Sequence, residues 1–253
     1  MSTPSAPVLF SFPTKDGLRD ALSSFVAKTS ADAIAKHGSF AIAISGGNVP
    51  KPLGGLIKEP TVQWDKWHVY YVDERVVPLD HADSNHKLCL DTLWSKVPIP
   101  QGQIHPIDTN HLDNLQQLSI SYAQGLKADS NLPSSGDIPS FDLILLRLGA
   151  DGHTASLFPG RPALSTSADQ LITFAEDAPR EPSKRVTFTI SVINNALRVA
   201  FVCTGAEKAE ALKNVLDGPE KGLPASRVKP AYWFVDDSAS AKAGYQRTPF
   251  DQL

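Results

Sequence analysis

The sequence predicts an α/β protein with a doubly wound, mainly parallel sheet flanked by helices on both faces. Short apolar runs alternate with segments of helical spacing along the chain. The run at residues 141–147 lacks the polar alternation of a half-exposed strand. Such a run is typical of a strand buried on both faces, as in a parallel sheet covered by helices.

Length and composition narrow the class of protein. The chain has 253 residues, which fits one α/β domain over residues 1–253. Charged residues make up 20% and the net charge is -3, so the basic excess typical of nucleic-acid binding is missing. No window approaches the roughly 20 apolar residues of a membrane helix. We therefore expect neither a nucleic-acid nor a membrane partner.

The expected compartment is the cytoplasm. Cys89 and Cys203 are far apart and lie outside any zinc-binding spacing, which indicates two unpaired thiols in a reducing environment. The N-terminal segment MSTPSAPVLFSFPTKDG lacks a positive region followed by a long apolar core, so it does not resemble a secretory signal.

The first half of the chain supplies four short apolar runs and the helices between them. Apolar side chains recur at helical spacing from Lys15 to Lys36, and His37-Gly38 provides a stop. Ser84 is suited to cap the helix that follows the third strand. The expected strands are residues 7–12, 40–44, 67–72 and 104–107, and the expected helices are residues 15–36, 85–94 and 111–128.

The second half continues the alternation. Two prolines and a glycine predict a loop at residues 130–140. The strand at residues 185–190 is expected to point its apolar side chains inward and Thr187 and Thr189 outward. The remaining expected elements are strands at residues 141–147, 171–175, 198–204 and 232–235, a helix at residues 205–216, and a polar tail at residues 236–246.

A glycine turn follows the strand at residues 40–44. Ser45-Gly46-Gly47-Asn48 and then Pro50 give the layout of a phosphate-binding turn, because paired glycines let backbone N–H groups converge on an anion at a helix start. Ser45 and Asn48 each offer one more donor. The same tetrapeptide also suits a plain left-handed turn, so the motif alone leaves both interpretations open.

Two further segments carry charge near predicted strand ends. Asp73-Glu74-Arg75 follows the strand at residues 67–72, on the same rim as the glycine turn if the strands are parallel. A surface ion pair is the alternative interpretation. Lys208 lies in the first turn of the helix at residues 205–216, where a cation opposes the helix dipole unless an anion is present.

The central stretch is residues 141–160, FDLILLRLGADGHTASLFPG. Its strand breaks at Gly149, and polar residues follow where open α/β sheets place their ligands. Asp151 precedes His153 across a glycine, so the carboxylate can fix which imidazole nitrogen is the free base. A solvated turn is the alternative for this motif alone. The combination with the turns near Ser45, Asp73 and Gly205 favours an active site.

Two other chemistries are disfavoured. The seven histidines are scattered, and none forms HxxxH or HxH with a carboxylate at ligand spacing, so we expect no metal site. No GxSxG elbow is present, which argues against a Ser-His-Asp hydrolase.

From about Phe40 to Val235 the chain resembles the 6-phosphogluconolactonases. The resemblance lies in ISGGNVPK, VDERVVPLDHADSN, LGADGHTASLFPG, KRVTFT, CTGAEKAEAL and PASRV, of which the third block is highly specific. It implies a Rossmann-like fold shared with glucosamine-6-phosphate deaminases, and no metal or organic cofactor. It also implies hydrolysis of 6-phospho-D-glucono-1,5-lactone to 6-phospho-D-gluconate in the oxidative pentose phosphate pathway. We expect a monomer.

The resemblance also implies roles for individual residues. His153 is the expected general base: it holds the water that attacks the lactone carbonyl, and Arg75 positions the substrate. The expected catalytic group is His153, Asp151, Arg75 and Asp73. The residues expected to hold the substrate phosphate are Ser45, Gly46, Gly47, Asn48, Arg185 and Lys208.

The sister deaminases differ at one informative position. Their signature places an acid five residues after the DGH histidine, where this chain has Phe158, so the lactonase interpretation is favoured. Two departures from the lactonase pattern are Arg147, where the family usually has glycine, and Asn48, where it usually has serine. A lactonase-like binding or regulatory protein without catalysis is a further alternative, against which the retained catalytic residues argue.

Overall fold

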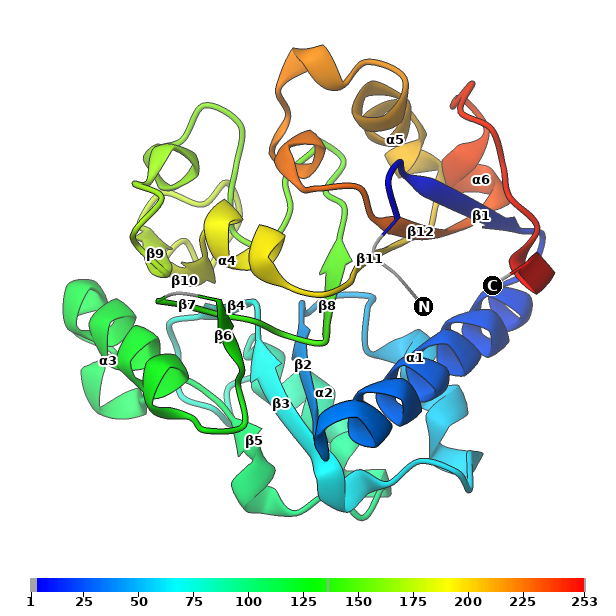
Figure 1. Cartoon of the computed structure of the whole chain (residues 1–253). Helices are drawn as coiled ribbons and strands as arrows, with labels where there is room; N and C mark the ends of the chain where they lie inside the picture. The colour runs from blue at the N-terminus through cyan, green and yellow to red at the C-terminus, as the bar shows by residue number, and fades with distance from the viewer. Residues whose placement is uncertain (1–3, 136, 253) are drawn as a thin grey trace.

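In the computed structural model, which describes residues 4–135 and 137–252, a seven-stranded sheet runs through the molecule (Figure 1). Neighbouring strands pair in parallel in the order β1-β12-β11-β8-β2-β3-β5. The predicted parallel sheet is confirmed. Its strands are β1 (Val8–Phe12), β2 (Phe40–Ile44), β3 (Trp67–Tyr71), β5 (Ile104–His105), β8 (Leu143–Arg147), β11 (Val199–Cys203) and β12 (Tyr232–Asp236).

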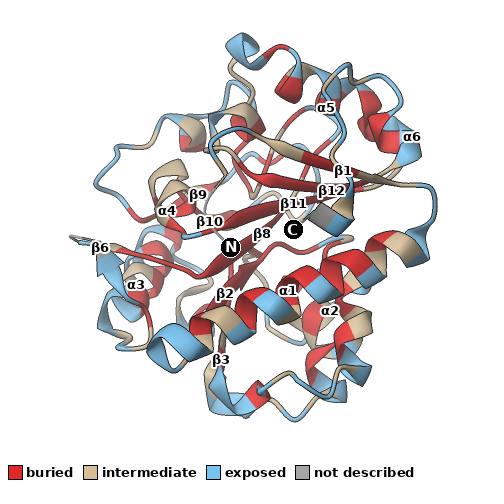
Figure 2. Cartoon of the chain, turned by 45° about the vertical axis from the view of Figure 1, so that its right-hand side comes forward, coloured by how far each residue is buried: buried red, intermediate tan, exposed pale blue. Residues whose placement is uncertain are grey.

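Apolar cores cover both faces of this sheet. In β8, Leu143 and Leu145 pack into one core, whereas Ile144 and Leu146 pack into the other. This two-sided burial explains why the strand reads as an uninterrupted apolar run. The strands are the most continuously buried part of the chain, and the helices around them expose their outer sides (Figure 2).

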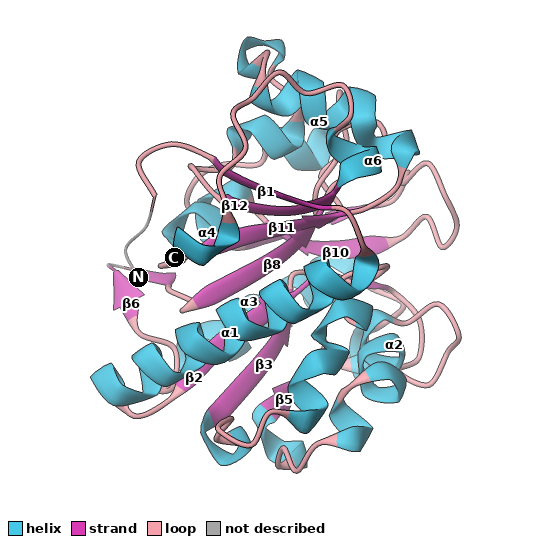
Figure 3. Ribbon diagram, turned by 90° about the vertical axis from the view of Figure 1, so that its right-hand side faces the viewer, coloured by secondary structure: helices cyan, strands magenta, loops and turns pink. Residues whose placement is uncertain are grey.

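Helices supply the outer layers (Figure 3). The first core contains residues of α1 (Lys15–His37) and α2 (Asn85–Thr92). The second contains residues of α3 (Leu115–Ala128), α4 (Ile190–Asn195), α5 (Ala209–Leu216) and α6 (Asp237–Ser240). The expected helices on both faces are therefore present. Among the described residues, no helix is both long enough and apolar enough to cross a bilayer.

The order of the strands defines where a ligand binds. From β2 the chain moves outward to β3 and β5, and it then returns to place β8 on the other side of β2. This reversal makes the carboxyl ends of β2 and β8 the topological switch point, where open α/β sheets form their ligand crevice. Ser45 directly follows β2, and Gly149 lies two residues after the end of β8.

A second, antiparallel sheet corrects two expectations. Asp73-Glu74-Arg75 is a short strand, β4 (Asp73–Arg75), between the main sheet and β10 (Arg185–Phe188), and β10 pairs in turn with β9 (Ile172–Ala175). The strand expected at residues 185–190 ends at Phe188, and its Thr187 is buried rather than outward because both faces of β10 are covered. Residues from Ile190 onward form α4 instead.

Local capping explains most element boundaries. Thr14 caps α1, Ser84 caps α2 as predicted, and Asn114 caps α3, which makes α3 begin later than expected. Residues 130–140 contain the hairpin β6 (Ser134–Ser135) and β7 (Ile138–Pro139), and the expected polar tail contains α6. The 3₁₀ helices are Lys51–Lys58, Trp64–Lys66, Trp94–Lys96, Gln101–Gln103, Thr109–His111, Pro162–Ser165, Ala206–Lys208, Pro219–Lys221, Pro224–Arg227 and Phe250–Gln252.

Candidate active site

The ten residues expected at the site converge on two adjoining cavities at the switch point. A large cavity of about 680 Å³ and a small inner recess of about 20 Å³ share Gly47, Arg75, Arg147, His153 and Arg185 as lining residues. Asn48, Asp151 and Lys208 also line the large cavity. Ser45, Gly46 and Asp73 also line the recess. Segments far apart in the sequence thus form one site.

His153 and Asp151 form a hydrogen-bonded pair. His153 Nδ1 lies 2.5 Å from Asp151 Oδ1, and the same oxygen accepts the His153 backbone N–H at 3.1 Å. Gly149 makes the pair possible, because a Cβ at this position would lie 2.0 Å from His153 Nδ1. The turn is closed by the Gly149 N–H, which donates to the His153 carbonyl at 2.8 Å.

The pair leaves Nε2 of His153 as the available nitrogen. Nδ1 faces the Asp151 carboxylate, whereas Nε2 has no hydrogen-bond partner among the described residues. The His153 side chain lines the cavity, so Nε2 is the nitrogen that a ligand can reach. Burial by itself raises the pKa of Asp151, but the hydrogen bond and charge of His153 outweigh it and lower that pKa to about 2. Asp151 is therefore ionised at neutral pH and orients the imidazole.

Phe158 forms one wall beside the imidazole. The ring centroids of His153 and Phe158 lie 4.6 Å apart at an interplanar angle of 45°, and Phe158 is buried. The side chain at position 158 thus contacts His153 directly. An apolar ring at this place offers no proton to a bound ligand.

Cationic side chains gather in the large cavity. It is lined by Arg75, Arg147, Arg180, Arg185 and Lys208. Within the part of the chain that the structure describes, none of the five forms an ion pair with a carboxylate. Burial, and then the neighbouring charge of Arg147, lower the pKa of Lys208. Asp83, Asp151, Glu181 and Glu207 line the same cavity, but none of them forms an ion pair with these five cations in the described structure, so the cations are available to bind an anion.

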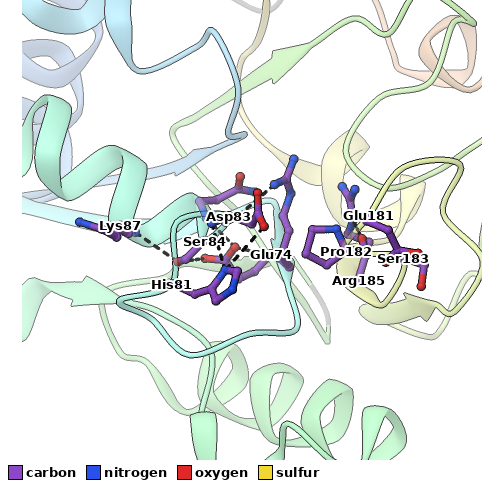
Figure 4. A network of polar contacts seen from close by, with 11 residues as sticks. Glu74, His81, Asp83, Ser84, Lys87, Glu181, Pro182, Ser183 and Arg185 are labelled. Carbon is purple, nitrogen blue, oxygen red and sulfur yellow. Dashed lines mark hydrogen bonds and ion pairs between the residues drawn. The ribbon is translucent and has the colours of Figure 1, made fainter.

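Arg185 is held from behind by backbone carbonyls. Its Nε donates to the Pro182 carbonyl at 2.6 Å and its Nη2 to the Arg180 carbonyl at 2.9 Å, as Figure 4 shows for Pro182. Arg185 also faces Arg75 across the β4–β10 ladder. Burial, followed by the charge of Arg75, lowers the pKa of Arg185. Both guanidinium groups are thus placed on the same cavity.

Asp73 lies deeper in the site than Asp151 does. Its carboxylate accepts the Ser156 hydroxyl at 2.8 Å, which ties β4 to the loop that carries His153. Asp73 is buried and lines only the inner recess. This contact fixes the Asp73 carboxylate beside Ser156 at the inner end of the site.

A buried hydrogen-bond network around the Glu74 carboxylate, next to Arg75, was not predicted from the sequence. The Glu74 carboxylate accepts the backbone N–H groups of Arg75, Asn85 and His86 at 2.7 to 2.8 Å. It also accepts the Ser84 hydroxyl at 3.2 Å (Figure 4). Burial raises the pKa of Glu74 to about 7, against the lowering effect of these N–H donors. Asn85 donates to the Asp73 carbonyl and lines the recess. The SN that ends the VDERVVPLDHADSN block was the available signal for Asn85.

The glycine turn presents polar atoms to the site. The Asn48 amide donates to Thr204 Oγ1 at 2.9 Å, which links the turn after β2 to the end of β11. The Ser45 hydroxyl and the Asn48 carbonyl oxygen are buried without a hydrogen-bond partner in the described part of the structure. These groups are free to bind a ligand at the inner end of the cavity.

Arg147 stands over the glycine turn. A Cβ on Gly47 would lie 2.9 Å from Arg147 Cδ. Gly47 also has a φ of +70°, so both the close approach of Arg147 and the left-handed backbone favour glycine here. The guanidinium lines both cavities. Arg147 therefore adds a positive charge to the cation group.

Comparison with known protein families gives one match over most of the chain. Residues 13–234 match the family model described as glucosamine-6-phosphate isomerases/6-phosphogluconolactonase. The match spans the sheet strands from β2 to β12 and every predicted site residue.

Curated relatives and solved structures agree with this match. The chain is 40% identical to probable 6-phosphogluconolactonase 4 of Arabidopsis thaliana, over 91% of this chain and 93% of the relative. It is 38% identical to the probable chloroplastic 6-phosphogluconolactonase 3 of Oryza sativa, over 91% of this chain and 74% of the relative. The structure of 6-phosphogluconolactonase from Trypanosoma brucei is similar with a TM-score of 0.82 and 25% identity, covering 94% of this chain and 99% of that one.

Proposed function

The chain belongs to the glucosamine-6-phosphate isomerase/6-phosphogluconolactonase family, and we propose that it hydrolyses 6-phospho-D-glucono-1,5-lactone to 6-phospho-D-gluconate. This reaction is a step of the oxidative pentose phosphate pathway. One observation carries the proposal: the His153–Asp151 pair and an unpaired group of cations line the same cavity. The His153–Asp151 pair is suited to activate a water molecule, and the cations are suited to bind the phosphate of the substrate.

His153 is the proposed general base. With Nδ1 held by Asp151, Nε2 takes a proton from a water molecule while the water oxygen forms a bond to C1 of the lactone. Asp151 stabilises the imidazolium that results. General-base assistance of this kind is typically worth roughly 10²- to 10⁴-fold in rate.

Attack of water on C1 gives a tetrahedral intermediate whose former carbonyl oxygen is negatively charged, and hydrogen-bond donors must stabilise this oxygen. Arg75 lines both cavities beside His153, and its guanidinium is anchored by a 2.9 Å hydrogen bond from Nη1 to the Asp83 carbonyl. We assign Arg75 to this oxygen. As the intermediate collapses, the bond from C1 to the ring oxygen breaks, and the imidazolium returns its proton to that oxygen.

The cations and the glycine turn are the proposed phosphate site. Lys208 and Arg185 supply charge, and the N–H groups of Gly46 and Gly47 supply donors in the turn between β2 and the following 3₁₀ helix, which begins at Lys51. The Ser45 hydroxyl, which lacks a partner in the described structure, can donate to the phosphate, and the Asn48 NH2 group, which donates to Thr204 Oγ1, is the second side-chain donor of this turn. A phosphate fixed here positions C1 near His153, which raises the rate through proximity.

The sister activity, deamination of glucosamine 6-phosphate, is not favoured by the site. The deaminase signature expects an acid at position 158, and Phe158 lies against the His153 ring. An apolar side chain cannot exchange a proton with the substrate.

A direct assay tests the proposal. The purified chain should accelerate the loss of freshly made 6-phosphogluconolactone well above its spontaneous hydrolysis, measured by trapping the remaining lactone or by release of acid. Absence of acceleration, together with retained binding of 6-phosphogluconate, would instead identify a binding or regulatory protein. A parallel assay for fructose 6-phosphate formation from glucosamine 6-phosphate tests the deaminase alternative.

We also propose that residues 1–253 act as one unit, as a monomer in the cytoplasm. The seven strands of the main sheet are drawn from the whole length between Val8 and Asp236, which supports one unit. Cys89 and Cys203 are buried free thiols, which suits a reducing compartment. Printed names of several plant relatives include a chloroplast location. Light scattering of the purified chain tests the assembly state, and imaging of a tagged chain tests the compartment.

A further inference from the structure

Two histidines and an aspartate meet at the outer edge of the main sheet. His68 lies on β3, His105 on the edge strand β5, and Asp129 at the end of α3. One ligand atom from each lies within 4.8 Å of the other two. None of the three lines the two cavities of the candidate active site. No motif in the sequence indicates this cluster, because its members are 24 to 61 positions apart.

The distances match donors that share one metal ion. His68 Nδ1 lies 3.3 Å from His105 Nε2, and His105 Nε2 lies 3.6 Å from Asp129 Oδ2. Zinc bonds of about 2.0–2.1 Å place the donors of a tetrahedron about 3.3–3.4 Å apart. The second distance is too long for a hydrogen bond. Since both imidazole nitrogens face each other, at least one lacks a proton, as metal ligation requires.

Outer contacts hold each of these side chains in place. The Tyr70 hydroxyl donates to Asp129 Oδ2 at 2.6 Å, and Asn131 donates twice to Asp129 Oδ1 at 2.9 Å. The Tyr70 ring stacks on His105 with centroids 4.5 Å apart and an interplanar angle of 8°. Hydrogen-bonded carboxylates and fixed imidazoles are the usual surroundings of metal ligands.

The cluster is also accessible. The side chains of His105 and Asp129 are 28% and 12% exposed, and both line a surface cavity of about 330 Å³ with Tyr70. A metal therefore has a path of entry, and a fourth coordination position is left for water.

We propose that His68, His105 and Asp129 bind a divalent transition metal of the zinc class. Two imidazoles and one carboxylate form a ligand set typical of zinc. The ion joins β3, the two-residue strand β5 and the end of α3, so it stabilises the edge of the sheet. This inference is independent of the proposed lactonase activity.

Cobalt and zinc are the probes. The full-length protein is freed of metal with a chelator and titrated with Co²⁺, whose visible absorption becomes intense in tetrahedral N/O sites, and Zn²⁺ is then added in competition. We expect stoichiometric absorption that Zn²⁺ removes, and a zinc-dependent rise in the melting temperature. His68→Asn and His105→Gln should abolish both effects.

Matched variants separate the site from general surface binding. His111→Gln is the control, because His111 faces a single carboxylate, that of Asp108, at 3.6 Å. It should bind Co²⁺ like the wild type. Tyr70→Phe should weaken Co²⁺ binding by roughly 10- to 100-fold, as loss of an outer contact does.

Two results would overturn the proposal. One is the absence of tetrahedral absorption in the wild type, and the other is its persistence in a folded His68→Asn/His105→Gln variant. If either variant fails to fold, anomalous scattering from zinc-soaked crystals of the wild type decides the matter. An ion peak between these three side chains supports the site. If ion peaks are found only at other places, the proposal is refuted.

Discussion

Arg75 and Arg185 lie directly opposite each other in the antiparallel ladder of β4 and β10. Like charges at opposed positions destabilise such a pair, and Arg147 and Lys208 line the same cavity. Burial, and then Arg75, lower the pKa of Arg185. The fold thus holds cations together at a cost in stability, and the proposed binding of a phosphate dianion would relieve it.

Inorganic phosphate should therefore stabilise the protein more than chloride at equal ionic strength. Binding to the native state alone adds about 2.7 kcal/mol at a ligand concentration of 100 times Kd. Thermal melts in phosphate and chloride measure the difference. The phosphate-specific shift should shrink strongly in Lys208→Ala. Equal shifts for both salts would argue against an anion site here.

His153→Ala should lower kcat by roughly 10²- to 10⁴-fold, because the general base is lost. Binding of 6-phosphogluconate, measured by calorimetry, should be largely retained, since the phosphate contacts lie elsewhere. His111→Ala serves as a control, because its imidazole lies outside the cavity beside Asp108. A variant with the wild-type rate would remove His153 from the role of base.

Lys208→Ala should raise KM for the phosphorylated lactone while changing kcat less. Discrimination between 6-phosphogluconolactone and gluconolactone should shrink, since the charge that recognises the phosphate is gone. Lys242→Ala is the matched control: Lys242 is exposed and pairs with Glu210 at 3.2 Å. Unchanged discrimination would place the phosphate at another part of the cavity.

Asp151 should make a pH-dependent contribution to stability. Its native pKa of about 2 lies below the ordinary value of 3.8, so ionised Asp151 stabilises the fold above about pH 4. The contribution is lost as the pH falls from there through 2. Because Asp151 is half exposed, its size is about 1 kcal/mol or less.

Urea melts of the wild type and Asp151→Asn measure this contribution. The difference in their free energies of unfolding should narrow as the pH is lowered from about 5. At neutral pH the same variant should also lose activity, because its amide no longer fixes the imidazole as the carboxylate does. A difference that stays constant with pH would contradict the stabilisation of ionised Asp151 by its contacts with His153.

Arg147→Gln should weaken substrate binding and raise KM, because Arg147 contributes charge to the cavity. The pKa of Lys208 should rise in this variant, since the charge of Arg147 lowers it after burial. NMR titration of the lysine measures that change. Arg161→Gln is the control, as Arg161 pairs with Asp177 at 2.6 Å. An unaltered KM would leave Arg147 as a packing residue over Gly47.

Much of the fold was predictable because its determinants are local. The run at residues 141–147 carries five apolar side chains because both sheet faces are covered, and Gly38 marks the end of α1 in the sequence. Where tertiary contacts override local pattern, prediction failed. Thr187 is buried inside the small sheet, and Asp73-Glu74-Arg75 pairs as a strand instead of turning.

The sequence by itself determined the residues of the His153–Asp151 motif, the glycine turn at Ser45 and the family to which they point. These are short-range motifs, and their chemistry follows from residue type and spacing. Only the tertiary structure decided that Arg75 faces Arg185, that Glu74 anchors the start of α2, and that His68, His105 and Asp129 meet at one edge. Such contacts depend on strand order and register, which periodicity along the chain does not specify.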